Sequence, residues 1–256
     1  PGPEGVAIGV DERTLGPVWL DLERGDPHFL VFGDAETGKT SLLRLLAGGI
    51  AASRSAEEAR LVVVDVRRSL ADLTGTPHVL AYATTPPAIS EALGQVQEMV
   101  AERIPAGDGG APAAPAPATA AFAGPRVYVL FDDYDLVASP GTSPLAPLFD
   151  LLALGREVGL HVMLARRVGG SARGSLEPGM QRVRELGSPG LVLSGEPSEG
   201  PLVGGVKASP QPPGRGLLVR RGSAPLVVQT AFAPPPAAGE RVAQPEPTAT
   251  SGFPVS

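Results

Sequence analysis

A glycine-rich octapeptide near the N-terminus has the residue types and the spacing that bind a chain of phosphates. Gly33 and Gly38 are followed by Lys39 and Thr40, which matches the pattern G-x-x-x-x-G-K-[ST]. Glycines let backbone N–H groups close around phosphate oxygens, and a helix that starts there adds the positive end of its dipole. We expect the Lys39 ammonium between the β- and γ-phosphates and the Thr40 hydroxyl on Mg²⁺. The predicted ATP-binding residues are Gly33, Asp34, Ala35, Glu36, Thr37, Gly38, Lys39, Thr40 and Ser41.

Apolar stretches flank this octapeptide on both sides, as phosphate binding requires. Residues 29–32 resemble a strand that leads into it, and residues 40–52 resemble a helix that begins inside it. A chance match in a glycine-rich chain has no reason to stand between a strand and a helix. The chain has no asparagine, which excludes the usual Asn-Lys-x-Asp motif that reads guanine in GTPases. We therefore predict ATP and Mg²⁺ as the ligands.

A second acidic element follows the apolar run at residues 127–131. It has the form of a Walker B strand, in which Asp132 would hold Mg²⁺ together with Thr40, usually through water. Asp133 stands where many hydrolysing ATPases carry a glutamate that orients the attacking water, so it is the candidate catalytic residue. Its side chain is one methylene shorter, and ~1 Å of misplacement can cost ~100-fold in rate. An acidic turn after a buried strand is the alternative interpretation.

The elements that would position these residues alternate between apolar runs of strand length and helix-like stretches. This alternation predicts an α/β fold with a mainly parallel sheet, and the continuous apolar runs indicate strands covered by helices on both faces. A C-terminal antiparallel hairpin is expected to close the domain, and Trp19 is expected to pack within a preceding edge strand at residues 18–22. The predicted strands are 29–32, 61–66, 79–82, 127–131, 161–165 and 191–193, the helices 40–52, 87–104, 145–158 and 176–186, and the hairpin strands 216–219 and 225–231.

The chain is expected to form one ATPase domain at residues 1–233. Within it, residues 105–125 are rich in alanine, proline and glycine and are predicted to be a mobile surface loop. Residues 234–256 are similarly rich in proline and are predicted to be a disordered tail.

Composition excludes several other classes of protein. The 256 residues are 43% hydrophobic with a mean hydropathy of +0.10, as expected of a globular domain. The net charge of -6 argues against a broad nucleic-acid-binding surface. Without cysteine there can be no disulfide, thiolate metal site or cysteine nucleophile. No apolar run reaches the ~18 residues that span a bilayer. With no initial methionine or signal peptide, we expect a soluble, cytoplasmic fragment whose membrane anchor would lie outside it.

Several segments resemble the FtsK/SpoIIIE-type ATPase domains of the type VII secretion coupling protein, the EccC family. They are IGVDERTLGPVWLDLERGDPHFLVFGDAETGKT, LVVVDVRRSL, LFDDYDLV, GLHVMLARR, LGSPGLVLSGEPSEGPLVGG and PPGRGLLVRRG. DDYDLV together with LARR is most similar to the last, third ATPase domain of that protein. The resemblance covers residues 6–232 and implies a P-loop NTPase of the RecA/FtsK type, with another strand between the Walker A and Walker B strands.

One departure from this superfamily concerns hydrolysis. In its motor domains the strand after Walker B commonly ends in a Thr-Gln pair that can sense the γ-phosphate, whereas here it ends in Arg166 and Arg167. Three interpretations stay open for these arginines: a solvated strand end, a nucleotide sensor, or a contact to a neighbouring ATPase domain. We expect weak hydrolysis or none by the isolated domain.

The resemblance also implies partners and a location. Members are membrane-anchored, hexamer-forming ATPases that select small helical-hairpin substrates for export at the cytoplasmic face of the cell membrane. It implies contacts with neighbouring ATPase domains and capture of the C-terminal signal peptide of a WXG-type substrate. A DNA-translocating ATPase of the same superfamily, an unrelated self-sufficient NTPase and a structural domain that only packs against its neighbours are the alternatives. An actinobacterial source fits the use of arginine in place of lysine.

Other polar residues have weaker interpretations. His28, His78 and His161 each stand at the start of an apolar run, whereas the ligand crevice of an open α/β sheet lies at the carboxyl ends of the strands. We therefore predict structural roles for the three histidines. Arg67 and Arg68 follow a predicted strand at its carboxyl end, where they could form plain surface or approach a phosphate or a partner.

Overall fold

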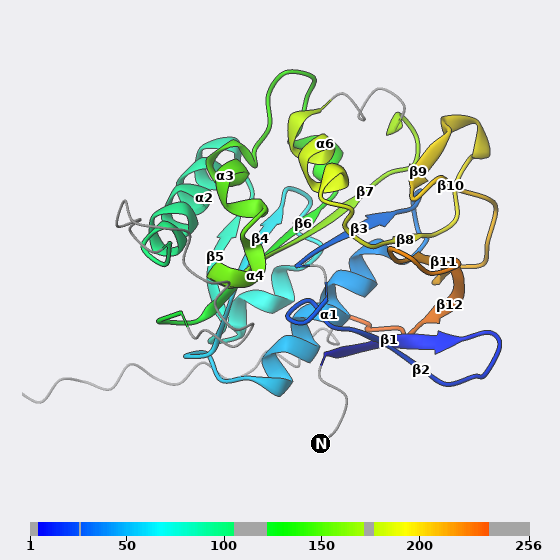
Figure 1. Ribbon diagram of the computed structural model, residues 1–256, viewed down its shortest axis with the longest axis horizontal. Coiled ribbons are helices and arrows are strands. Elements are labelled where there is room, and N and C mark those ends of the chain that lie inside the picture. The colour runs from blue at the N-terminus through cyan, green and yellow to red at the C-terminus, as the bar shows by residue number, and fades with distance from the viewer. Residues whose placement is uncertain (1–4, 26, 105–121, 172–176, 236–256) are drawn as a thin grey trace, which may run out of the picture.

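The computed structural model describes residues 5–25, 27–104, 122–171 and 177–235 (Figure 1). Among these residues, ten strands form one sheet in the order β2-β1-β12-β11-β8-β3-β7-β6-β4-β5. The parallel part comprises β3 (His28–Phe32), β4 (Ala59–Asp65), β5 (Val79–Ala83), β6 (Arg126–Asp132), β7 (Leu160–Arg166) and β8 (Gly190–Val192). The antiparallel part comprises β1 (Val6–Asp11), β2 (Pro17–Leu20), β11 (Arg215–Val219) and β12 (Leu226–Thr230).

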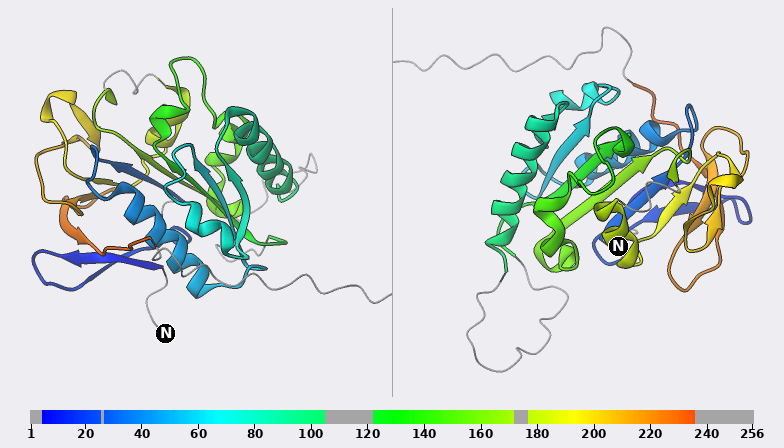
Figure 2. Two further views of the ribbon diagram at one scale, coloured as in Figure 1. Left: turned by 180° about the vertical axis from the view of Figure 1, so that it is seen from behind. Right: turned by 90° about the horizontal axis from the view of Figure 1, so that it is seen from above.

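Helices cover both faces of the sheet (Figures 1 and 2). One face carries α1 (Lys39–Ser53) and the short helix η1 (Ala71–Gly75). The other face carries α2 (Pro86–Ala101), η3 (Ala146–Leu148), α3 (Phe149–Leu152), α4 (Gly155–Val158) and α6 (Pro178–Glu185). Connecting segments form η2 (Tyr134–Leu136), η4 (Pro197–Glu199) and a separate hairpin of β9 (Pro201–Val203) and β10 (Val206–Lys207). The predicted α/β fold, its mainly parallel sheet and its C-terminal hairpin are confirmed.

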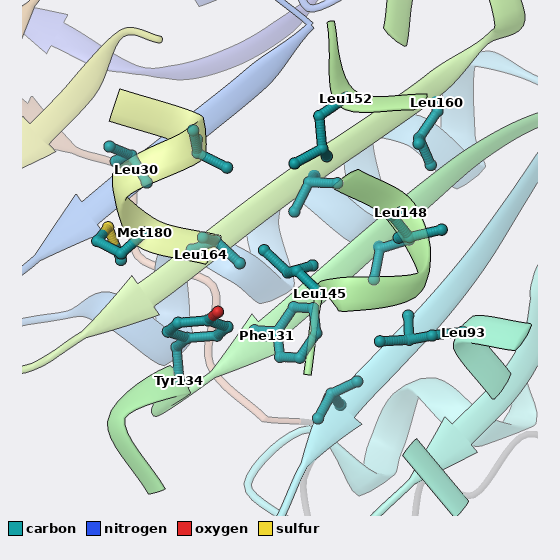
Figure 3. Close-up of a cluster of buried hydrophobic side chains, with 14 of the residues drawn as sticks. Leu30, Leu93, Phe131, Tyr134, Leu145, Leu148, Leu152, Leu160, Leu164 and Met180 are labelled. Atoms are coloured by element: carbon teal, nitrogen blue, oxygen red, sulfur yellow. The ribbon is translucent and has the colours of Figure 1, made fainter. Parts of the chain in front are cut away.

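The core lies on both faces of the central strands because their side chains alternate between them. Val62 and Val64 of β4 pack on the α2 face, whereas Leu61 and Val63 pack on the α1 face. Figure 3 shows the cluster on the α2 face, where Tyr134 meets Phe131 edge-on with ring centroids 5.2 Å apart. Burial on both sides explains why these strands read as continuous apolar runs rather than alternating ones.

The sheet order determines which sequence motifs meet. β7 lies between β3 and β6, so another strand separates the strand that enters the glycine-rich loop from the strand that ends in Asp132. This confirms the arrangement implied for RecA/FtsK-type domains. Since parallel strands end at the same edge, Gly33, Asp132 and Arg166 come together at one edge of the sheet.

The predicted helix at residues 145–158 is wrong as a continuous element, because η3, α3 and α4 replace it. Pro147 lacks the N–H that a helix interior needs, and it lies in the first turn of η3. Further along, the Leu152 carbonyl accepts a hydrogen bond from His28 Nε2 at 2.8 Å, so the donor comes from β3 instead of the next helical turn.

Other boundaries also differ from the prediction. The predicted mobile loop at residues 105–125 lies outside the described residues only up to 121, since Phe122 packs beneath the Arg103 and Arg126 guanidinium groups at 4.8 and 5.5 Å. α6 begins at Pro178 because Glu177 caps it, while the predicted start at residue 176 lies outside the described residues. Of the predicted tail, residues 236–256 also lie outside them.

Strand β1 was not predicted, whereas the edge strand around Trp19 was. β1 inserts between β2 and β12, so the N-terminal residues and the C-terminal hairpin extend one antiparallel part of the sheet.

In the described part of the chain, no helix combines the length and the apolar character needed to cross a membrane.

Candidate nucleotide-binding site

The backbone of the glycine-rich loop is fixed by hydrogen bonds to carbonyl groups at the ends of neighbouring strands. Gly33 N donates to Arg166 O of β7 at 3.2 Å, and Asp34 N donates to Ser194 O beyond β8 at 2.9 Å. The Thr37 hydroxyl donates to Asp34 O across the loop at 2.9 Å. Gly38 has φ +108°, a conformation that favours glycine, and it is the residue before α1. The loop therefore leads directly into a helix N-terminus, as phosphate binding requires.

Lys39 is buried at the first position of α1, and its ammonium donates to Asp34 O within the loop at 2.9 Å. Burial lowers the pKa of Lys39, while the negative charges of Asp133, Asp132 and Asp135 act in the opposite direction. A buried ammonium surrounded by loop backbone suits a ligand with several phosphate oxygens.

Thr40 and Asp132 meet across the candidate site, which brings two oxygen ligands together. The Thr40 hydroxyl donates to Asp132 Oδ2 at 2.7 Å, whereas Asp132 Oδ1 is buried with no hydrogen-bond donor among the described residues. Burial raises the pKa of Asp132 to about 6, and the nearby Asp133 and Asp65 add to the effect. A divalent cation would supply the positive charge that this carboxylate lacks, so these two oxygen ligands fit Mg²⁺.

Asp65 is a site residue that the sequence analysis missed. It is the last residue of β4 and pairs in register with Asp132 of β6. Its Oδ2 accepts hydrogen bonds from Leu70 N at 2.6 Å and from the Tyr82 hydroxyl at 2.7 Å, while its buried Oδ1 has no donor in the described structure. An aspartate at the carboxyl end of a strand beside the Walker B strand was the available signal.

The candidate catalytic residue Asp133 is held by an ion pair. Its Oδ2 lies 2.8 Å from Arg67 Nε, and Asp133 itself adopts a left-handed conformation with φ +50°. Asp133 is mostly buried, with 15% of its side chain exposed, against 50% for Arg67. The plain-surface interpretation of Arg67 is therefore incomplete, because its guanidinium occupies the carboxylate that would orient water.

The two arginines at the end of β7 lie in different surroundings. Arg166 is 5% exposed, so the interpretation as a solvated strand end is wrong for it. Burial lowers its pKa, and the charges of Asp135 and Glu177 oppose that effect. Arg167 is half-buried, and its backbone N–H donates to Asp135 Oδ1 at 3.1 Å. The positive charge of Arg167 adds to the lowering of the Lys39 pKa.

The three histidines are buried at the opposite edge and bind backbone. His28 accepts from Val162 N through Nδ1, while His78 Nε2 and His161 Nδ1 lie 2.8 and 3.2 Å from the carbonyls of Arg54 and Pro27. Within the described ranges, no group of three or more His, Cys, Asp or Glu side chains could hold a metal ion.

Comparison with known proteins agrees with this geometry. Residues 4–106 match the FtsK/SpoIIIE family. The ESX secretion system protein EccC of Thermomonospora curvata is 41% identical over 227 residues, covering 89% of this chain and 17% of that protein. The ESX-4 secretion system protein EccC4 of Mycobacterium tuberculosis is 40% identical over 231 residues, covering 90% and 18%. The chain thus spans about a sixth of the length of these relatives.

Two solved structures have the same fold. The cytoplasmic domain of the type VII secretion ATPase EccC of Thermomonospora curvata superposes with a TM-score of 0.83 at 40% identity, covering 91% of this chain and 27% of that one. EccC ATPases 2 and 3 of the same organism, in complex with a signal sequence peptide, give 0.82 at 39% identity, covering 91% and 42%. This chain is an FtsK/SpoIIIE-type ATPase domain, homologous to the ATPase domains of the EccC secretion proteins.

Proposed function

We propose that this domain binds Mg-ATP, hydrolyses it slowly or not at all by itself, and serves a type VII secretion ATPase as a regulatory and substrate-docking module. The observation that carries the proposal is the contrast within one site. The phosphate loop with Lys39, Thr40 and Asp132 is complete, whereas Asp133, where an ATPase needs a free carboxylate, is paired with Arg67. Such a site is equipped to retain ATP more than to cleave it.

The residues that would hold the ligands follow from their chemistry. Backbone N–H groups of residues 33–41 and the Lys39 ammonium would bind the phosphates, and Thr40 and Asp132 would hold Mg²⁺ directly or through water. Bound Mg²⁺ supplies positive charge at the β- and γ-phosphate oxygens. Arg167, half-buried directly after β7, would contact either the nucleotide or a neighbouring ATPase domain.

Slow hydrolysis follows from what Asp133 already does. To orient an attacking water, its carboxylate must accept a hydrogen bond from that water at short range. The charge-assisted contact with Arg67 competes for the same oxygen, and the short aspartate side chain cannot reach beyond it. The combination disfavours turnover by the domain alone.

The partners rest on the relatives. A homologous structure of 39% identity is a complex with a signal sequence peptide, and it contains two ATPase domains. We extend this to the chain described here: it would dock the C-terminal signal of a secreted WXG-type substrate and pack against neighbouring ATPase domains. The domain would work at the cytoplasmic face of the cell membrane. A segment outside these 256 residues would anchor it there.

The test is to measure ATP turnover of the chain alone, with duplex DNA and with a labelled C-terminal peptide of a genomically linked substrate. We expect little turnover in all three conditions and saturable peptide binding below ~100 µM when ATP is present. Basal turnover near the ~10 s⁻¹ typical of enzymes would contradict the regulatory role. Stimulation by DNA would favour a DNA-translocating motor, and a folded domain that does not bind the peptide would leave only a structural packing role.

A further inference from the structure

The chain that follows β12 crosses the first turns of α1, and we name residues 231–235 the C-terminal strap. Ala231 N donates to Ile8 O of β1 at 3.0 Å, and Ala233 N donates to Ser41 Oγ at 3.0 Å. Arg44 Nη1 donates to Ala233 O at 3.3 Å. Figures 1 and 2 show this segment running alongside α1. Its backbone is therefore fixed both to the edge of the sheet and to the helix that begins in the phosphate loop.

Phe232 lies between these two fixed points, and its ring projects into solvent. It is 78% exposed, although the residues on either side of it are anchored by backbone hydrogen bonds. Covering this ring would recover ~1.5–3 kcal/mol of apolar burial. Its place on an ordered segment beside the first turn of α1, more than its exposure, makes it available to a ligand of the phosphate loop. Ser41, on which the strap rests, directly follows the predicted magnesium ligand Thr40.

Contacts on the two sides of the phosphate loop indicate the direction in which a bound nucleotide would extend. The contact between Thr40 and Asp132 places the magnesium end on the side of β6. Gly214, the residue before β11, borders the loop on the opposite side, because its N–H donates to Thr37 O at 2.8 Å. A Cβ added to Gly38 would lie only 3.4 Å from Gly214 Cα. With its terminal phosphates toward β6, a nucleotide therefore directs its base toward Gly214 and the strap.

We propose that Phe232 stacks on the base of the bound ATP, so that the C-terminal strap forms one wall of the base site. The inference rests on the proposed ATP binding by the phosphate loop. Stacking of a base on an aromatic ring supplies affinity without reading hydrogen-bond donors, and it explains an exposed ring held in place by anchored neighbours. The contacts of the strap with Ser41 and Arg44 hold the ring beside the first turn of α1.

Calorimetry with two ligands separates base binding from phosphate binding. We expect Phe232→Ala to weaken Mg-ATP by about 5- to 150-fold, the range for losing one stacked base, while the affinity for Mg-tripolyphosphate stays unchanged. Lys39→Ala should weaken both ligands. Leu15→Ala is the matched control, because Leu15 is 76% exposed in the turn between β1 and β2, and it should change neither.

Each alternative outcome has a definite meaning. If the wild-type chain does not bind Mg-ATP, the proposed function itself fails. If it binds ATP but Phe232→Ala keeps full affinity, or loses both ligands equally, the base site is wrong while ATP binding stands. Full ATP affinity together with weaker association to a neighbouring ATPase domain would assign Phe232 to a domain interface.

A spectroscopic readout covers the case in which tripolyphosphate binds too weakly to measure. In a Trp19→Phe background, which removes the only native tryptophan, Phe232→Trp places a single fluorophore at the strap. Stacking predicts that ATP quenches its emission and that tripolyphosphate at the same concentration does not. Identical spectra with and without saturating ATP would overturn the proposal.

Discussion

At the scale of single residues, the ion pair between Arg67 and Asp133 has the most direct chemical consequence. It joins the turn after β4 to the turn after β6, two segments that the register Asp65 to Asp132 brings side by side. The guanidinium contacts Oδ2, so a water must compete with it for that oxygen and the carboxylate is less free to orient the water. The same pair also ties together two loops at the edge of the candidate site.

Releasing and lengthening this carboxylate should restore hydrolysis. We expect the combined variant Arg67→Ala, Asp133→Glu to turn over ATP at least ~10-fold faster than the wild type, since ~1 Å of placement is worth up to ~100-fold. Release of inorganic phosphate measures the rate, and Arg68→Ala, one residue away and also exposed, is the control. If the combined variant stays slow while Arg167→Gln accelerates turnover, the cation at the end of β7 is the main defect instead.

At the scale of elements, α6 depends on a buried acidic cap. Glu177 is 2% exposed, and its two carboxylate oxygens accept hydrogen bonds from Gly179 N at 3.0 Å and Met180 N at 2.6 Å. A negative charge at this end also complements the helix dipole. The negative charge of Glu177 also raises the pKa of the buried Arg166, against the effect of burial.

Removal of this cap should destabilise the domain through a local cause. Glu177→Ala is expected to lower the free energy of unfolding by about 2 kcal/mol, because two helix N–H groups lose their acceptor and Arg166 loses a compensating charge. Urea denaturation followed by circular dichroism measures the change. Glu185→Ala, at the exposed last turn of the same helix, should stay within ~0.5 kcal/mol. Equal effects of the two variants would argue against the capping role.

At the scale of the whole molecule, the buried His161 makes global stability depend on pH. Burial lowers the pKa of His161 to about 3, with the charge of His28 as a further cause, and its ring stacks on Tyr128 at 4.6 Å. In the unfolded chain the same imidazole has a pKa near ~6.5. Between these values the unfolded state binds a proton that the folded state does not, so stability falls as the pH drops from about 6.5 toward 3.

The variant His161→Gln should flatten that dependence. One such group contributes up to ~1.4 kcal/mol per pH unit, and this contribution disappears when residue 161 cannot titrate. Urea titrations at several pH values between about 7 and 4.5 would show a smaller loss of stability than in the wild type, whatever the offset between the two proteins at pH 7. Parallel curves over this range would refute the assignment.

The sequence by itself determined the features whose physics is local. Nine consecutive residues supply the backbone and side-chain groups of the phosphate loop, so their order alone predicts the loop. The central strands are buried on both faces and are therefore continuously apolar, so the apolar runs predict them. The pair Asp132 and Asp133 was likewise readable at the end of its strand. The resemblance to secretion ATPase domains followed from the same contiguous segments.

Only the tertiary structure decided the relations between distant segments. Sheet order places Asp65 beside Asp132 and lets Arg67 reach Asp133, and no spacing in the sequence encodes that order. A hydrogen bond from His28, more than a hundred residues away, helps to divide the helix predicted at residues 145–158. Strand β1 forms because it can pair with β12. The C-terminal strap is positioned by its contacts with α1. Such contacts depend on how the whole chain packs, because each needs a partner that only the folded sheet brings near.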